Sequence, residues 1–96
     1  MMQKTILNIN KRAIEICHIS SEIRINCDNE LMDGWDQAKL YCQFLTINGN
    51  NNWRLPTVHE RDLMYQYSVV DRTLYFYCQR QQLGGGWVRA VRDYGV

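Results

Sequence analysis

Residues 53–63 read WRLPTVHERDL and carry the strongest local structural signals in the chain. Pro56 restricts Leu55 to extended geometry, because the proline ring clashes with a helical residue that precedes it. Thr57 and Glu60 have the Thr-x-x-Glu spacing of a capping box, in which each side chain bonds to the backbone N–H of the other residue. We therefore expect an extended segment that ends at Pro56 and a helix that starts at about Thr57.

Trp53 and Leu55 stand immediately before this helix, which should run to about Ser68. A large apolar ring and a branched side chain at this point can fill the gap between helix and sheet. We expect them to hold this helix, and an earlier one, on a small sheet. Structural roles are therefore assigned to Trp53, Leu55, Pro56, Thr57 and Glu60.

The earlier helix is expected to start at Asp33, whose carboxylate can cap it, and to end near Ile47. Trp35, Ala38 and Cys42 recur at helical spacing and form one apolar stripe. The asparagine and glycine run that follows favours turns and cannot continue the helix. Trp35 and Cys42 are therefore assigned structural roles as well.

Apolar and polar residues alternate in three other parts of the chain. Residues 5–27 have the two-residue period of strands and predict a three-stranded antiparallel meander. Residues 73–78 and 87–92 alternate again and predict a C-terminal hairpin. We expect a single α+β domain over residues 1–96, in which a small antiparallel sheet, made of the meander and the hairpin, packs with two helices.

Length and charge limit the functional classes. The chain has 96 residues and a formal net charge of +1, so its total charge does not predict attraction to nucleic acid or anionic lipid. No apolar run approaches the roughly 18–20 residues of a membrane span, and the first residues lack the apolar core of a signal peptide. We therefore expect a cytoplasmic protein that has no membrane partner.

The four cysteines are Cys17, Cys27, Cys42 and Cys78, and no two of them form a Cys-x-x-Cys pair. Three interpretations stay open. In a reducing compartment they act as small, buried, apolar side chains. Alternatively, a disulfide such as Cys42 with Cys78 forms, or some of the cysteines bind a metal ion.

The sequence offers few groups for catalysis. His18 is in phase with an apolar strand face, and His59 pairs with Asp62 at i, i+3 without the second histidine or nearby cysteine of a zinc site. We expect His59, Glu60 and Asp62 to lie on a solvated helix face. The glycines at 84–86 precede a strand, so they lack the helix N-terminus of a phosphate loop. We expect no enzymatic activity, no catalytic or metal-binding residue and no cofactor.

Arginine and aromatic residues gather in the C-terminal half. Every basic residue after Gly49 is an arginine, the cation better suited to planar recognition in partly desolvated contacts. Aromatic residues and arginine are also enriched at protein interfaces. Whether these side chains form an interface or merely cover the sheet stays open. The candidate binding residues are Tyr75, Tyr77, Arg80, Trp87, Arg89 and Arg92.

Several of these stretches together resemble the Lcl C-terminal domain family, long described as a domain of unknown function. The resemblance covers about two thirds of the chain. It rests on Trp35, Ala38, Tyr41, Cys42, Leu45, the Asn/Gly loop, residues 53–57 with Glu60, and residues 88–92. It implies a fold similar to C-type lectins and formylglycine-generating enzymes, and a glycan-binding role known for some relatives. The insert before the final strand is shorter here, and no pair of reactive cysteines matches the formylglycine-generating site.

Three functional hypotheses follow. The leading one is a small interaction module that binds a protein, for example a phage or mobile-element product that inhibits a host protein. The second, implied by the resemblance, is a carbohydrate-binding domain. The third is a nucleic-acid-binding module in which Arg80, Arg89 and Arg92 contact phosphates and Tyr75 or Tyr77 stacks on bases.

Overall fold

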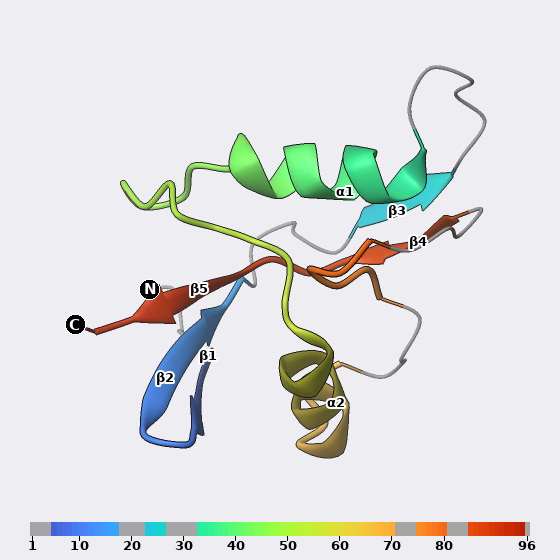
Figure 1. Ribbon diagram of the computed structural model, residues 1–96. Coiled ribbons are helices and arrows are strands. Elements are labelled where there is room, and N and C mark those ends of the chain that lie inside the picture. The colour runs from blue at the N-terminus through green and yellow to red at the C-terminus, as the bar shows by residue number, and fades with distance from the viewer. Residues whose placement is uncertain (1–4, 18–22, 27–32, 71–74, 81–84, 96) are drawn as a thin grey trace.

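The computed structural model shows an α+β fold with antiparallel strand pairing, as expected (Figure 1). It describes residues 5–17, 23–26, 33–70, 75–80 and 85–95. In chain order the elements are β1 (Thr5–Ile9), β2 (Arg12–Ile16), β3 (Ile23–Asn26), α1 (Gly34–Gln43), α2 (Val58–Gln66), β4 (Gly85–Val88) and β5 (Val91–Tyr94). No helix within these described ranges combines the length and apolar character needed to cross a bilayer.

The strands form two sheets, of which one has the order β1-β2-β5 and the other pairs β3 with β4. The expected meander is therefore wrong beyond β2, whose second neighbour is β5 rather than β3. The expected C-terminal hairpin is also wrong. Strands β4 and β5 each pair with an N-terminal strand, and the bridge from Tyr75 to Trp87 is parallel rather than antiparallel. Periodicity identifies strands but does not say which strands lie side by side.

The hairpin of β1 and β2 is confirmed. Ile9 pairs with Arg12, which leaves Asn10 and Lys11 as a two-residue loop. Both loop residues have positive φ, at 48° and 68°. A two-residue type I′ turn requires positive φ at both of its residues. Its twist then matches the twist of the two strands that it connects.

Helix α1 begins where the sequence predicts, since the Asp33 carboxylate accepts a hydrogen bond of 2.9 Å from the Asp36 N–H. It ends at Gln43, before the expected end near Ile47. Ile47 instead exchanges two backbone hydrogen bonds with Asn50, at 3.0 and 2.9 Å, across a tight turn. Phe44 is the C-cap of the helix, and Asn48 and Gly49 adopt positive φ in the turn that follows, a conformation that asparagine and glycine favour.

Helix α2 has the predicted capping box. The Thr57 N–H donates to the Glu60 carboxylate at 2.8 Å, and the Glu60 N–H donates to the Thr57 hydroxyl at 3.1 Å. The helix ends at Gln66, two residues before the expected Ser68. Its buried residues are only Glu60 and Met64, so it is attached to the fold along a narrow stripe.

Buried side chains form two clusters, one for each helix. The α1 cluster contains Cys17, Trp35, Ala38, Cys42, Trp53, Leu55, Phe76, Val88 and Ala90. The α2 cluster contains Ile14, Ile16, Met64, Val70, Tyr75 and Val91. In Figure 1, α1 lies over β3 and β4, whereas α2 lies at the opposite end of the molecule, near β1 and β2. Trp53 and Leu55 are thus core residues as predicted, but they pack with α1 alone and do not hold both helices.

An extended segment, residues 53–57, runs between the two clusters. We call this segment the strap. The Arg54 N–H donates to the Val91 carbonyl at 2.8 Å, and the Val91 N–H donates back at 2.9 Å. The Cys78 N–H donates to the Pro56 carbonyl at 2.8 Å on the same segment. The strap is therefore bonded through its backbone both to β5 and to residues 76–80.

Replacement of Trp53 by alanine should lower the free energy of unfolding by about 3–5 kcal/mol, because it leaves a large cavity in the α1 cluster. The indole is only 4% exposed. Urea denaturation followed by circular dichroism measures the change. Phe44→Ala is the matched control, since Phe44 is 81% exposed; its effect should stay within about 0.5 kcal/mol. A Trp53→Ala protein as stable as the parent would show that the ring is peripheral.

Candidate functional site

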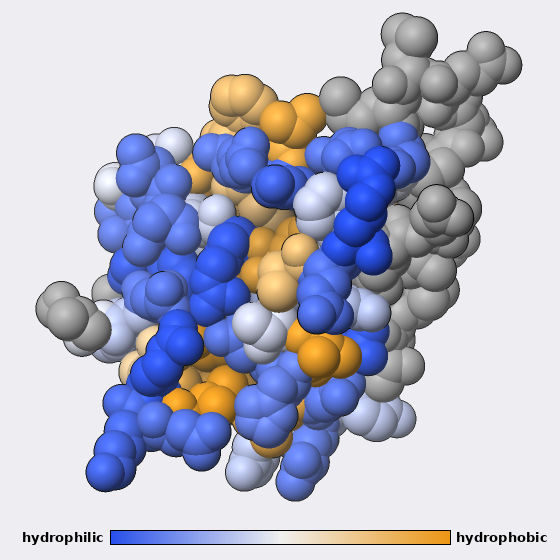
Figure 2. Space-filling model, in the orientation of Figure 1, coloured by the Kyte–Doolittle hydropathy of each residue, from blue (hydrophilic) through white to orange (hydrophobic). Residues whose placement is uncertain are grey.

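A small apolar cleft of about 130 Å³ lies between α1 and the strap. Figure 2 shows hydrophobic residues reaching the surface among hydrophilic ones below α1. The residues that line the cleft are Trp35, Lys39, Gln43, Trp53, Arg54, Leu55 and Cys78. Trp35, Lys39 and Gln43 are spaced at i, i+4 and i+8, which places them along one face of α1.

The two indoles that wall the cleft are fixed by hydrogen bonds. The Trp35 Nε1–H donates to the Tyr77 carbonyl at 2.9 Å, and the Trp53 Nε1–H donates to the Asn50 carbonyl at 3.2 Å. A buried indole N–H needs such a partner, and here each partner is a backbone carbonyl. The rings are consequently held in place before any ligand arrives.

Cations lie over the Trp35 ring. The Lys39 ammonium is 5.1 Å from the ring centre, and the Arg80 guanidinium carbon is 5.3 Å from it. Arg80 also donates to Asp36 at 3.1 and 3.2 Å and forms an ion pair with Asp33. The Asp36 N–H, together with the charge of Arg80, holds the pKa of the Asp33 carboxyl below its usual range. This set of ion pairs ties residues 76–80 to the first turn of α1.

The described cysteines form no disulfide and have different surroundings. Cys17 and Cys42 are buried in the α1 cluster, whereas Cys78 is exposed and lines the cleft. The interpretation as buried apolar side chains therefore holds for the first two and is wrong for Cys78. A Cys42–Cys78 disulfide is absent, and Cys27 lies outside the described residues. Burial, with the neighbouring Cys17, raises the pKa of Cys42 to about 12, so its thiol stays protonated and unreactive.

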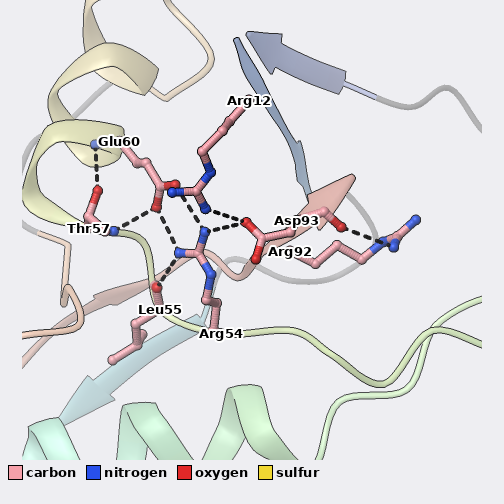
Figure 3. Close-up of polar contacts among 7 residues, drawn as sticks. All are labelled: Arg12, Arg54, Leu55, Thr57, Glu60, Arg92 and Asp93. Atoms are coloured by element: carbon pink, nitrogen blue, oxygen red, sulfur yellow. Dashed lines mark hydrogen bonds and ion pairs between the residues drawn. The ribbon is translucent and has the colours of Figure 1, made fainter. Parts of the chain in front are cut away.

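The strap is joined to α2 and β5 by an ion-pair network (Figure 3). Arg54 donates to both carboxylate oxygens of Glu60, at 2.8 and 3.0 Å, and to Asp93 at 3.0 Å. Asp93 also accepts from Arg12 at 2.9 Å. Glu60 is 6% exposed, so its expected place on a solvated helix face is wrong, whereas His59 and Asp62 are exposed as predicted.

The network perturbs the protonation of its members. Burial raises the pKa of Glu60, but the hydrogen bonds from Arg54 and the Thr57 N–H outweigh burial and bring that pKa below its usual value. Hydrogen bonding from Arg54 likewise lowers the pKa of Asp93. The same bond to Glu60 raises the pKa of Arg54, which therefore stays charged. These shifts mean that the charged forms stabilise the fold.

Two of the predicted binding residues lie beside the cleft. Tyr77 supplies the carbonyl that holds the Trp35 indole, and its own ring is 4.9 Å from the guanidinium carbon of Arg61 on α2. Arg80 lies over Trp35 and is largely exposed.

The other four predicted binding residues lie elsewhere. Tyr75 is 1% exposed and belongs to the α2 cluster, and the half-buried Trp87 packs against that cluster. Arg89 donates to the Cys17 carbonyl at 3.0 Å. Arg92 pairs with the buried Glu15 at 2.8 Å. The six residues therefore do not form one surface.

These placements also bear on the nucleic-acid hypothesis. Arg80 and Arg92 are already paired with carboxylates, and Arg89 is bonded to backbone. The carboxylates compete with a phosphate for the guanidinium groups of Arg80 and Arg92. The cleft residues Lys39 and Gln43 were missed, although their spacing from Trp35 was visible in the sequence.

A wider, shallower groove of about 450 Å³ lies on the β1-β2-β5 sheet. Its lining residues are Asn8, Lys11, Arg12, Ala13, Asp93, Tyr94 and Gly95. The Arg92 guanidinium carbon lies 5.6 Å from the Tyr94 ring centre and 5.7 Å from that of Trp53. The groove thus combines one aromatic ring with several polar side chains.

Comparison of the chain with protein-family models, with curated proteins and with solved structures found no match. The resemblance to the Lcl C-terminal domain family, with the lectin-like fold that it implies, stays a prediction.

Replacement of Glu60 by glutamine should lower the free energy of unfolding at pH 7 by about 1–3 kcal/mol, because it removes the buried carboxylate that accepts two hydrogen bonds from Arg54 and leaves only the exposed Asp93 as a charged partner among the described residues. The contribution of Glu60 is present above its unfolded-state pKa of about 4.3, and is lost as pH falls through the lower folded-state pKa. The difference between parent and variant should therefore be largest near pH 7 and shrink as pH is lowered through and below the unfolded-state value.

Urea denaturation across this pH range measures the difference. Asp62→Asn, which removes an exposed carboxylate from the same helix, should change stability by less than about 1 kcal/mol. A Glu60→Gln protein whose stability equals that of the parent at pH 7 would rule out a stabilising role for the Arg54–Glu60 pair.

Proposed function

We propose that the chain is a non-enzymatic module that binds a partner protein, and that the cleft receives one apolar side chain of that partner. The size and lining of the cleft are the observation that supports this function. Its walls are two fixed indoles and Leu55, and its volume is about 130 Å³. Such a module acts by occupying the surface of its partner.

The volume favours a protein over a free ligand. Sites for small molecules usually enclose about 300–1,000 Å³, whereas a cavity of about 150 Å³ can hold a benzene ring. The cleft therefore fits a single side chain. Protein interfaces are commonly dominated by a few anchor residues that fill such pockets.

An exposed aromatic residue next to the cleft supplies further contact area. Phe44 directly follows Gln43, which lines the cleft, and is 81% exposed. Aromatic side chains bury much apolar area when a partner covers them. Tyr75 and Trp87, by contrast, pack in the α2 cluster or against it.

A cytoplasmic location suits this module. Cys17, Cys42 and Cys78 form no disulfide, and Cys78 is exposed. Exposed thiols persist where the compartment is reducing.

Replacement of Cys78 by phenylalanine should fill the cleft and weaken partner binding by about tenfold or more. Cys78→Ser is the matched control, because it changes the same side chain without adding bulk and should bind like the parent. Both substitutions keep the backbone hydrogen bond from residue 78 to Pro56. The tagged chain first captures a near-stoichiometric partner from the cells that produce it, and calorimetry with the purified partner then gives the affinities.

Melting temperatures of the two variants should agree within a few degrees, which excludes unfolding as the cause of lost binding. The proposal fails if the parent captures no near-stoichiometric partner. It also fails if the Cys78→Phe and Cys78→Ser proteins bind that partner equally well.

A carbohydrate ligand is the second candidate, favoured by the groove around Tyr94. Its open shape suits a sugar chain, whose C–H face can pack on an aromatic ring. Asn8, Lys11 and Asp93 line the same groove and can bond to hydroxyl groups. The resemblance to the Lcl C-terminal domain family independently suggests such a ligand.

On a glycan array, the parent should bind a defined set of glycans and Tyr94→Ala should lose that binding. Phe44→Ala, an exposed aromatic outside the groove, should retain it. Signals at background level for the parent, or equal signals for Tyr94→Ala, would remove the carbohydrate candidate.

A further inference from the structure

The charged side chains that line the cleft are both cations. Lys39 projects from α1 and Arg54 from the strap, and none of the described residues that line the cleft carries a carboxylate. A cleft with apolar walls and a positive rim favours a ligand that has an apolar body and a negative group close to it.

The charge of Arg54 is already used within the fold. Its guanidinium donates to Glu60 at 2.8 and 3.0 Å, to Asp93 at 3.0 Å and to the Leu55 carbonyl at 3.2 Å. A guanidinium with these partners has little attraction left for a further anion. The recognition of a negative group at the cleft therefore depends on Lys39.

Among the described residues, no carboxylate neutralises the charge of Lys39. Asp36 lies three residues before it on α1, but it is bonded to Arg80 at 3.1 and 3.2 Å. Within the described residues no carboxylate forms an ion pair with Lys39. Its ammonium lies 5.1 Å from the centre of the Trp35 ring, which walls the cleft. This cation, unpaired within the described part of the chain, is thus held beside the place where the apolar side chain would enter.

We propose that the residue bound in the cleft is the carboxyl-terminal residue of the partner protein, with its apolar side chain between the indoles and its α-carboxylate on Lys39. The side chain and the carboxylate of a terminal residue start from the same Cα, so a cleft that holds one residue can contact both. In an extended peptide, neighbouring side chains point to opposite sides, so an aspartate or glutamate next to an internal anchor would direct its carboxylate away. Gln43, one helical turn beyond Lys39, can bond to the preceding peptide group.

Because a protein partner is assumed, this proposal rests on the proposed function, but short peptides test it on the purified chain. The probes are acetyl-Gly-Gly-Phe with a free carboxylate, the same peptide as its C-terminal amide, and acetyl-Gly-Asp-Phe amide. Titration of the ¹⁵N-labelled chain follows the indole N–H resonances of Trp35 and Trp53. The free acid should shift both resonances and bind about fivefold more tightly than either amide, which is the gain expected from one exposed ion pair.

Two variants identify the cation. Lys39→Gln should reduce the affinity for the free acid to that for the amide, whereas Lys11→Gln, at an exposed lysine outside the cleft, should leave it unchanged. The proposal is overturned if acid and neutral amide bind equally, if Lys39→Gln keeps the preference for the acid, or if the aspartate-containing amide binds as tightly as the acid. It is also overturned if no peptide shifts the indole resonances. None of these results would decide whether the chain binds a partner protein at all. The comparison of Cys78→Phe with Cys78→Ser tests that proposal separately.

Discussion

The fold depends on how the strap distributes its side chains. In an extended segment, successive side chains point to opposite sides. Trp53 and Leu55 therefore enter the α1 cluster, while Arg54 between them turns to Glu60 of α2 and Asp93 of β5. Backbone hydrogen bonds between Arg54 and Val91 attach the same segment to the three-stranded sheet. One short piece of chain thus joins the two clusters, helix α2 and the three-stranded sheet.

This arrangement also creates the cleft. Trp53 and Leu55 form one wall because the strap passes beneath α1, and Trp35 forms the other because the helix presents one face to the strap. The walls cannot easily collapse, since both indole N–H groups are bonded to backbone carbonyls. The same constraint that holds the fold together therefore leaves a small apolar hollow open at the surface.

Local features were predictable from the sequence, and non-local ones were not. The capping box of Thr57 and Glu60, the cap at Asp33 and the hairpin of β1 and β2 depend on residues close together in the chain, so their spacing reveals them. The partners of β3 and β5 depend on contacts between distant segments, which alternation does not specify. The ion pairs of Arg54 could not be predicted from the sequence, because tertiary structure brings Glu60 and Asp93 to it. Tyr75 and Trp87 are residue types that are enriched at interfaces, yet in this small fold they pack in the α2 cluster or against it. For the cleft, the spacing of Trp35, Lys39 and Gln43 was visible, but the opposite wall required the path of the strap.

Native-state amide hydrogen exchange at Arg54 and Val91 tests most directly whether the strap is an integral part of the core. Their N–H groups form the pair of hydrogen bonds between the strap and β5. If the strap holds the clusters together, both amides should exchange only through global unfolding, with an opening free energy equal to that from urea denaturation. Exchange of both amides at a much lower free energy, while amides of β2 stay protected, would show that the strap detaches locally and would contradict its central role.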